Sequence, residues 1–202
     1  ILRLEMPRPD GFDIKAGHYL QLRVPTLKRY EWHDFSLTGI REDKDVIVLK
    51  IKAMGDWTDK LMELLGDDDS TNIVVDIRGP FASPAARVTK EDQWLMVAGG
   101  IGITPFLGLL HTMLFHSSKI KQFHLIWVLR DNKLLTWLEP FLTSPIFNRV
   151  TLHIYLTRDN NNNELPHWLA KEQRNERISL LHERPNWENL FTQIAQELQQ
   201  PH

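Results

Sequence analysis

Ala98-Gly99-Gly100-Ile101-Gly102-Ile103-Thr104-Pro105 is the stretch that decides the fold. It follows the apolar run Trp94 to Ala98 and opens a second apolar run, Pro105 to Phe115. Glycines let a backbone turn sharply and approach a phosphate closely. The free amides and the dipole of a helix start favour negative charge, and a first-turn proline is tolerated there. The stretch therefore predicts a strand, a phosphate-binding turn and a helix, with a turn that only packs helix on strand as the alternative.

Strand and helix patterns alternate after this stretch. Phe123 to Leu129 and Val150 to Leu156 are predicted to be apolar strands, with a helix from Leu134 to Leu142 between them. Continuous apolar strands in this order are typical of a parallel sheet covered on both faces. A last helix is predicted from Trp187 to Leu198, because its apolar residues fall on one stripe. The C-terminal half is therefore predicted to be an α/β nucleotide-binding domain.

The N-terminal half is rich in short strands separated by polar turns. Four strands are predicted: His18 to Val24, His33 to Thr38, Val46 to Ala53 and Ile73 to Ile77. One helix, Trp57 to Leu65, interrupts them and ends at Gly66. This pattern indicates a small antiparallel barrel. We place the domain boundary near Thr89, ahead of the charged residues 90–92, which gives domains 1–89 and 90–202.

Composition excludes several classes of function. The 202 residues include 24 basic and 26 acidic side chains and no long basic block, so nothing favours nucleic acid as a partner. The absence of cysteine excludes disulfides, thiolate zinc sites and a cysteine nucleophile. The nine histidines lack metal-ligand spacing, so we expect no metal site and histidines scattered over the surface or a site. The longest apolar stretch, Gly102 to Phe115, is too short to cross a bilayer, and the segment is expected to be soluble.

The glycine motif carries a family resemblance. Gly100-Ile101-Gly102-Ile103-Thr104-Pro105 has proline where the usual dinucleotide motif has its third glycine. This form resembles the NADP-binding half of ferredoxin-reductase-like flavoenzymes, in which a flavin-binding barrel precedes the nucleotide domain. The resemblance implies two domains, an antiparallel FAD-binding β-barrel of the ferredoxin-reductase type followed by an α/β parallel-sheet domain. It also implies NADPH contacts from Gly99, Gly100, Gly102, Ile103, Thr104 and Pro105.

A second motif lies in the barrel half. His33-Asp34-Phe35-Ser36 is similar to the H-P-F-T or H-P-F-S strand of NADPH oxidases, with Asp34 in place of proline. The run Arg29-Tyr30-Glu31-Trp32-His33 resembles the calcium-regulated branch of that family. The resemblance implies that Phe35 stacks on the isoalloxazine ring of FAD, that Ser36 approaches its redox nitrogen, and that His33 lies near the pyrophosphate or ribityl chain. From the residues alone, Phe35 is better interpreted as an ordinary core residue of a strand.

A third motif, Lys50 to Thr58, looks like the oxidase segment that ends in G-x-W-T. Lys50 and Lys52 share one strand face, Gly55 turns the chain, and Thr58 begins a helix. The resemblance places Lys50, Lys52, Gly55, Trp57 and Thr58 at the FAD pyrophosphate, whereas solvated lysines and a capping threonine are the alternative. Arg78-Gly79-Pro80-Phe81 resembles the D-G-P-Y/F segment between the domains and is predicted to be a structural turn.

Two arginine motifs complete the resemblance. Trp127-Val128-Leu129-Arg130-Asp131 is similar to the oxidases' W-x-x-R-D, and Arg184-Pro185-Asn186-Trp187 to their R-P-N/D-W. They imply that Arg130 and Arg184 bind the adenosine 2′-phosphate of NADPH, a role that suits the planar guanidinium. The alternative is that each arginine forms a surface ion pair. Asp131 is predicted to be only a helix cap.

The resemblance covers about Gly11 to Leu198 and implies the dehydrogenase domain of an NADPH oxidase. NADPH would reduce FAD, and single electrons would pass to haems in a membrane domain of the same polypeptide, outside this chain, to reduce oxygen to superoxide or hydrogen peroxide. No side-chain acid, base or nucleophile is required. The segment would lie at the cytosolic face of a membrane, with a calcium-sensing regulatory domain as a candidate partner.

Three other functions stay open at this point. A ferric reductase and a soluble flavin reductase belong to the same superfamily, but the G-D-W-T and R-P-N-W segments favour the oxidase. A nucleotide-binding regulatory module without turnover is the alternative from another class. Both ends of the chain look cut: residues 1–6 begin in mid-strand, and the family's C-terminal F-C-G-P strand would lie beyond His202. We therefore expect a piece of a longer protein.

Overall fold

The computed structural model describes residues 1–41, 45–66, 73–90, 92–115, 122–142, 144–158, 165–172 and 177–199. The chain forms two compact units. One comprises Ile1–Thr89 with Thr104–Phe115, and the other comprises Lys90–Ile103 with His116–His202. The division into domains 1–89 and 90–202 stays a prediction, and Glu91 at that boundary lies outside the described residues.

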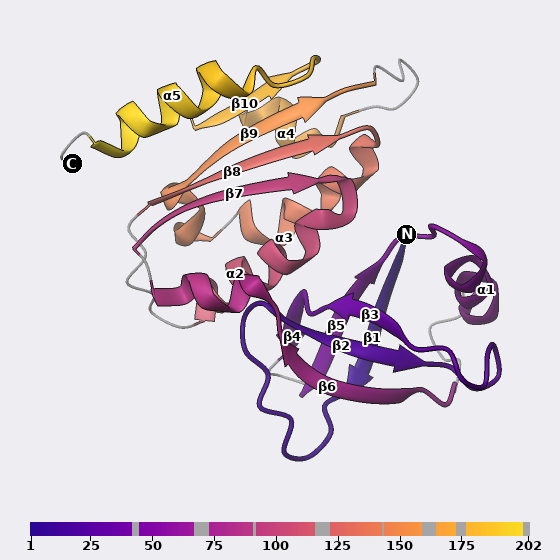
Figure 1. Ribbon diagram of the computed structural model, residues 1–202. Helices are drawn as coiled ribbons and strands as arrows, with labels where there is room; N and C mark the ends of the chain where they lie inside the picture. Colours follow the sequence, from indigo (N-terminus) through magenta and orange to yellow (C-terminus); the bar gives the residue numbers. More distant parts are fainter. Residues whose placement is uncertain are drawn as a thin grey trace. The chain divides into compact units, whose positions relative to one another are not determined.

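Six strands of the first unit form two antiparallel sheets (Figure 1). One sheet has the order β1-β5-β4, with bounds Leu2–Pro7, Val46–Ile51 and Gly39–Arg41. The other has the order β3-β2-β6, with bounds His33–Ser36, His18–Arg23 and Asp76–Ala82. Inward residues of both sheets share one core with helix α1, Asp56–Leu65: Leu20, Leu22, Ile47, Leu49, Ile51, Trp57 and Leu61. The alternation of apolar residues along β2 and β5 produces this core, because every second side chain of a strand points inward.

The last strand of the first unit differs from its prediction. The strand expected at Ile73 to Ile77 begins only at Asp76, and Val74 is 70% exposed. The run Arg78 to Phe81, predicted to be a turn, instead lies within β6. Its pairing with β2 shifts register between Tyr19 and Gln21, so β6 bulges there. The turn-like Gly-Pro sequence marks this bulge rather than the end of a strand.

Helix α2, Thr104–Phe115, groups with the first unit through a close backbone contact. A methyl group on Gly108 would overlap the carbonyl oxygen of Leu37, and one on Gly39 would lie 2.7 Å from the ring of His111. Only glycine lets the helix approach the segment after β3 so closely. Helix α2 is thus held against the strand that carries the flavin motif.

The second unit is built on a parallel sheet of order β10-β9-β8-β7 (Figure 1). Its strands are Gln93–Gly99 (β7), Gln122–Leu129 (β8), Val150–Leu156 (β9) and Ile178–Leu181 (β10). The predicted fold, antiparallel strands followed by a parallel α/β sheet, is confirmed. Strands β8 and β9 are almost wholly buried, as expected, but β7 exposes Leu95 and Val97 at 44% and 45%. The expectation of cover on both faces is therefore wrong for β7, an edge strand of the described sheet.

Short helices and turns connect these strands. They are the 3₁₀ segments Pro84–Lys90, Gly100–Ile103, Asn132–Leu138 and Pro145–Arg149, and the helices α3 (Glu139–Leu142), α4 (His167–Glu172) and α5 (Trp187–Gln199). The helix predicted from Leu134 to Leu142 is therefore two segments. Pro140 explains the break, because it lacks an N–H and its ring clashes with the carbonyl of the preceding turn.

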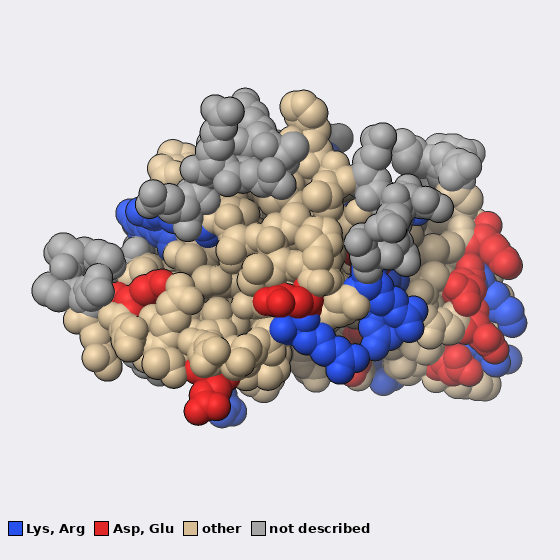
Figure 2. Space-filling model, turned by 90° about the horizontal axis from the view of Figure 1, so that it is seen from above, with Lys and Arg blue, Asp and Glu red and all other residues tan. Residues whose placement is uncertain are grey.

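Helix α5 covers one face of the parallel sheet. Its Leu190 and Ile194 pack on Ile126 of β8 and Tyr155 of β9. No helix within the described ranges is long and apolar enough to span a bilayer. The face seen in Figure 2 carries basic and acidic side chains in small groups around a larger uncharged area, in line with the near balance of charges in the sequence.

Candidate functional site

The glycine turn is fixed to the neighbouring strand. Gly100 adopts a left-handed backbone with φ of 48°, which favours glycine. Its carbonyl oxygen accepts a hydrogen bond of 2.9 Å from Nε1 of Trp127, a fully buried residue of β8. A buried indole N–H needs such a partner, so this bond sets the path of the turn.

The turn leaves room for a ligand. A methyl group built on Gly99, Gly100 or Gly102 meets no atom within 4 Å, and Gly99 and Gly102 are exposed. A phosphate could thus reach the backbone amides before α2 without meeting a side chain. Ile103 and Thr104 are buried, at 0% and 8% exposure, so only their backbones could contact a ligand. Pro105 is half-buried in the first turn of α2, where its missing N–H is not needed.

The two predicted arginines lie at the same edge of the sheet as the glycine turn. Arg130 directly follows β8, and Arg184 follows β10. The strands are parallel, so their carboxyl ends meet at one edge, where α/β sheets bind ligands. Both guanidinium groups are exposed, and neither forms an ion pair with the described part of the chain. Their roles as phosphate ligands and as ion-paired surface residues both stay predictions, with no ion pair seen among the described residues.

A third arginine at this edge was missed by the sequence analysis. Arg158 lies two residues after the end of β9, which runs between β8 and β10. Neighbouring strands are about 4.8 Å apart, so Arg130, Arg158 and Arg184 follow three adjacent strands across about 10 Å. Thr157 ties this end of β9 to β8, because its backbone N–H and its hydroxyl both donate to the carbonyl of Leu129, at 2.9 Å and 3.3 Å. The signal that could have revealed Arg158 is its place directly after an apolar strand.

Two side chains beside these arginines have structural roles. Asp131 caps the following 3₁₀ segment by accepting from the N–H of Lys133 at 3.1 Å, which confirms its prediction as a cap. Asn186 was assigned no role, yet its Oδ1 accepts from the N–H of Asn189 at 3.2 Å at the start of α5. This capping bond fixes the start of α5 at Trp187, three residues after Arg184.

The flavin motif on β3 packs against α1. The ring of His33 stacks on Trp57, with centroids 4.1 Å apart, and Phe35 lies 6.0 Å from the same indole. Phe35 also packs against the barrel core. The structure therefore brings His33, Phe35 and Trp57 together, with Phe35 partly a core residue and only partly exposed.

The other face of β3 carries Asp34 and Ser36. Asp34 accepts a hydrogen bond of 3.0 Å from Gln21 of β2, so the residue that replaces the family's proline is tied to the neighbouring strand. Ser36 is half-buried, and its hydroxyl has no hydrogen-bond partner among the described residues. This hydroxyl is thus available to donate to a ligand or accept from it.

The segment after β5 forms a tight turn into α1. The hydroxyl of Thr58 accepts from the N–H of Met54 at 2.8 Å and donates to the carbonyl of Gly55 at 2.9 Å. Thr58 is therefore used locally, but the N-cap of α1 is Gly55 and Thr58 lies inside the helix, so its role at the FAD pyrophosphate stays a prediction. Gly55 is exposed, with open space around it. The first turn of α1 also carries Asp56 and Asp59, whose charges oppose a phosphate at this helix start.

Two lysines precede this turn. Lys50 of β5 and Lys52, which directly follows β5, are half-buried, and each has a partner within the protein. The sequence analysis also missed a cation–π cluster next to the flavin motif. The indole of Trp32 lies 3.8 Å from the guanidinium carbon of Arg78 and 4.9 Å from that of Arg23. Arg78 stands where the family segment has aspartate, so its positive charge could not be read from the resemblance.

Two buried nitrogens test the fit of a flavin to this unit. Nε2 of His33 and Nε1 of Trp57 are buried without a hydrogen-bond partner among the described residues. Nε2 of His33 lies 3.5 Å from a carboxylate oxygen of Glu31, but the contact lacks hydrogen-bond geometry. A buried donor without a partner is unfavourable, and a phosphate or a ribityl hydroxyl would satisfy it. The stacked pair and the free hydroxyl of Ser36 therefore fit a polar aromatic cofactor.

Comparison with known proteins gives two family matches. Residues 92–202 match the model described as the ferric reductase NAD binding domain, and residues 1–85 match an FAD-binding domain. Human NADPH oxidase 5 is 25% identical over 98% of this chain and 36% of its own length. Human NADPH oxidase 3 is 30% identical over 96% of this chain and 38% of its own length. The chain thus spans less than two fifths of either relative.

The fold has solved counterparts. A ferredoxin-NADP⁺ reductase from Neisseria gonorrhoeae, with bound FAD and NADP, superimposes with a TM-score of 0.56 at 18% identity. The match covers 92% of this chain and 75% of that protein. At this identity the likeness concerns the fold, which agrees with the two units described above.

Proposed function

We propose, from the premise that this chain belongs to the ferric reductase NAD-binding domain family, that it is the dehydrogenase region of an NADPH oxidase. The observation that supports this most directly is the edge of the parallel sheet, where a glycine turn and exposed arginines come together. FAD, when bound, would accept a hydride from NADPH and release electrons singly. The protein's task is to hold both cofactors and to exclude water between them.

The second unit would bind NADPH. Backbone amides of Gly99, Gly100 and Gly102 would bind the pyrophosphate, which needs the open space found there. Arg130 and Arg184 would bind the 2′-phosphate, and Arg158 between their strands adds a third positive charge. Ile103, Thr104 and Pro105 would contribute only through the backbone and the start of α2.

The first unit would bind FAD. Ser36 would hydrogen-bond the ring edge, and Phe35 would provide an apolar contact to its face. His33, on Trp57, would donate from its unpartnered nitrogen to the phosphate or ribityl chain. Lys50 and Lys52 would offset the negative charge of the FAD phosphates beside Asp56. Gly55 would leave open space for the phosphates, and the hydrogen bonds of Thr58 fix the turn before α1.

The proposal extends to the whole protein that this chain would belong to. A membrane haem domain of the same polypeptide would take the electrons at the cytosolic face and reduce oxygen to superoxide or hydrogen peroxide. The R-Y-E-W-H run supports a place in the calcium-regulated branch, with a calcium-sensing domain as partner. Ferric reductase activity is the second candidate, because one matching family model bears that description.

Charge removal at the arginine edge tests the nucleotide assignment. Arg130→Ala or Arg184→Ala should weaken NADPH binding about tenfold to a hundredfold, because a charge-assisted hydrogen bond contributes about 1.5–3 kcal/mol. NADH, which lacks the 2′-phosphate, should bind almost unchanged. Arg149→Ala is the matched control, since Arg149 lies before β9 at the opposite edge of the sheet. Calorimetric titration that shows equal losses for both nucleotides would contradict the assignment.

A further assay separates the candidate functions. With FAD bound and oxygen absent, NADPH should bleach the visible flavin absorbance of the chain. A flavin that binds but stays oxidised would support the regulatory module. In the full-length protein, oxygen consumption and iron reduction distinguish the oxidase from the ferric reductase.

A further inference from the structure

Two buried histidines face each other beneath α5. His124 of β8 is fully buried and His153 of β9 is 7% exposed, although the sequence analysis placed the histidines on the surface or at a site. Their rings are nearly parallel, at 11°, and Nδ1 of His124 lies 3.3 Å from Nε2 of His153. This pair is not part of the proposed cofactor contacts.

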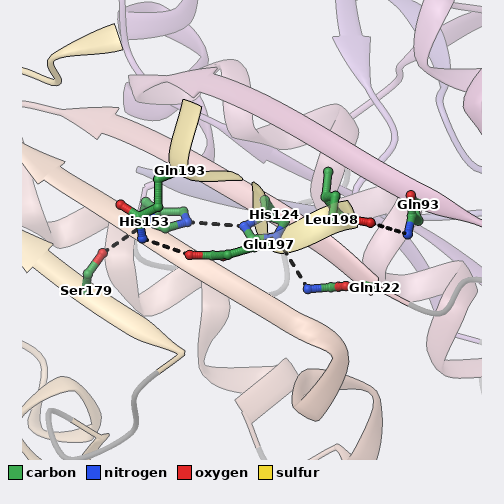
Figure 3. A network of polar contacts seen from close by, with 8 residues as sticks. All are labelled: Gln93, Gln122, His124, His153, Ser179, Gln193, Glu197 and Leu198. Atoms are coloured by element: carbon green, nitrogen blue, oxygen red, sulfur yellow. Dashed lines mark hydrogen bonds and ion pairs between the residues drawn. The ribbon is translucent and has the colours of Figure 1, made fainter. Parts of the chain in front are cut away.

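Polar contacts connect the two histidines to β10 on one side and to α5 on the other (Figure 3). Nδ1 of His153 lies 3.3 Å from the hydroxyl of Ser179 on β10. Nε2 of His124 lies 3.8 Å from a carboxylate oxygen of Glu197, in the last turn of α5. Gln193, one turn earlier on α5, donates to the same carboxylate at 2.8 Å. The network thus joins three strands of the sheet to the end of one helix.

One proton arrangement satisfies the whole chain with both rings neutral. Ser179 donates to Nδ1 of His153, Nε2–H of His153 donates to Nδ1 of His124, and Nε2–H of His124 points at Glu197. Nε2 of His124 also lies 3.5 Å from the side-chain amide of Gln122, whose oxygen can face it if the amide is turned. The contacts from Ser179 to His153 and from His153 to His124 then each pair one donor with one acceptor, while Glu197, at 3.8 Å, acts on His124 by its charge.

Full protonation removes this match. When each ring has taken up an extra proton, Nδ1 of His124 and Nε2 of His153 both carry N–H groups and face each other at 3.3 Å. The pair then also holds two like charges in a buried place. Glu197 can offset only one of them. We propose that His124, His153 and Glu197 form a proton-sensitive latch, which holds the last turns of α5 on the sheet while the histidines are neutral and releases them when both are protonated.

The direction of the pH effect follows from burial. Burial lowers the pKa of both histidines below the ordinary value, and the neighbouring imidazole lowers that of His153 further, while Glu197 opposes both shifts. With α5 released, His124 and His153 bind protons near pH 6.5, whereas with α5 docked they bind them only at lower pH. Docking is therefore complete above about pH 6.5 and is lost as the pH falls below it. Tyr155, which also faces α5, stays neutral here because burial and Glu183 raise its pKa.

Hydrogen–deuterium exchange of the full chain at pH 7.5 and pH 5.5, corrected for chemical exchange, tests the latch. In the wild type Glu197 offsets the first proton and only the second opposes docking, so the protection of α5 should fall about tenfold over this range. His124→Phe/His153→Phe keeps two stacked rings but cannot titrate, so its α5 protection should not change with pH. His167→Gln, an exposed histidine of α4, is the control and should behave like the wild type.

Glu197→Gln gives a second test that does not depend on the double variant. Without the carboxylate the first proton also opposes docking, so the pH effect on α5 should grow toward a hundredfold. Protection of α5 that is independent of pH in the wild type would overturn the latch. So would an unchanged pH effect in the double phenylalanine variant, a smaller effect in Glu197→Gln, or simultaneous loss of protection in β2 and β5, which would indicate global unfolding.

Discussion

Trp127→Phe tests how the glycine turn is held in place. The change removes the 2.9 Å hydrogen bond to the Gly100 carbonyl and leaves a smaller ring at a fully buried position. The lost bond costs about 1 kcal/mol. The cavity, roughly 40 Å³, costs about another 1 kcal/mol at ~24 cal/mol per Å³. We therefore expect the free energy of unfolding to fall by about 2 kcal/mol, measured by urea titration followed by circular dichroism.

The same variant should bind NADPH more weakly. A turn that is no longer anchored must be ordered by the ligand, at a cost of about 1 kcal/mol, or about fivefold in Kd. Trp94→Phe is the matched control, because Trp94 is a buried tryptophan on the same sheet face. It should also lose stability, but with the NADPH Kd unchanged. Equal NADPH affinities for the two variants would refute the idea that Trp127 orders the turn.

Three further substitutions test neighbouring parts of the account. Gly102 has open space around it, so Gly102→Ala should change the free energy of unfolding by less than about 0.5 kcal/mol. The same change should weaken NADPH binding at least about tenfold in calorimetry, and unchanged affinity would contradict the phosphate site. Gly108→Ala should lower the free energy of unfolding by about 1–2 kcal/mol in urea titration, because overlap with the Leu37 carbonyl outweighs the gain in helix propensity. A stabilised variant would refute the close contact. Asn186→Ala should cost about 1 kcal/mol and speed hydrogen exchange at the Asn189 amide, and unchanged exchange there would exclude its role as a cap.

Local patterns in the sequence predicted most of the fold. Strand β9 and the start of α5 fall on the predicted residues, because continuous apolar runs and a helical stripe report burial directly. The glycine turn was placed correctly between β7 and α2 for the same reason. The predictions were wrong where pairing with another strand decides the local structure. The run Arg78 to Phe81 looks like a turn, but pairing with β2 keeps it in a strand.

The site was less predictable than the fold. Motif resemblance brought His33, Phe35 and Ser36 to notice, but not that His33 stacks on Trp57, which depends on packing between β3 and α1. Arg158 carries no motif; its place after the apolar strand β9 is its one sequence signal, and the strand order β10-β9-β8 is what puts it between Arg130 and Arg184. Likewise, no spacing rule relates His124 to Glu197, since three strands and a helix bring this network together.

Anaerobic reduction of bound flavin is the most direct test of the central claim. The chain is loaded with FAD in the absence of oxygen, and the visible flavin absorbance is followed after NADPH or NADH is added. The account predicts that NADPH bleaches the bound flavin and that Arg130→Ala needs far more NADPH to do so, with the NADH response unchanged. Bound flavin that stays oxidised at saturating NADPH would contradict it.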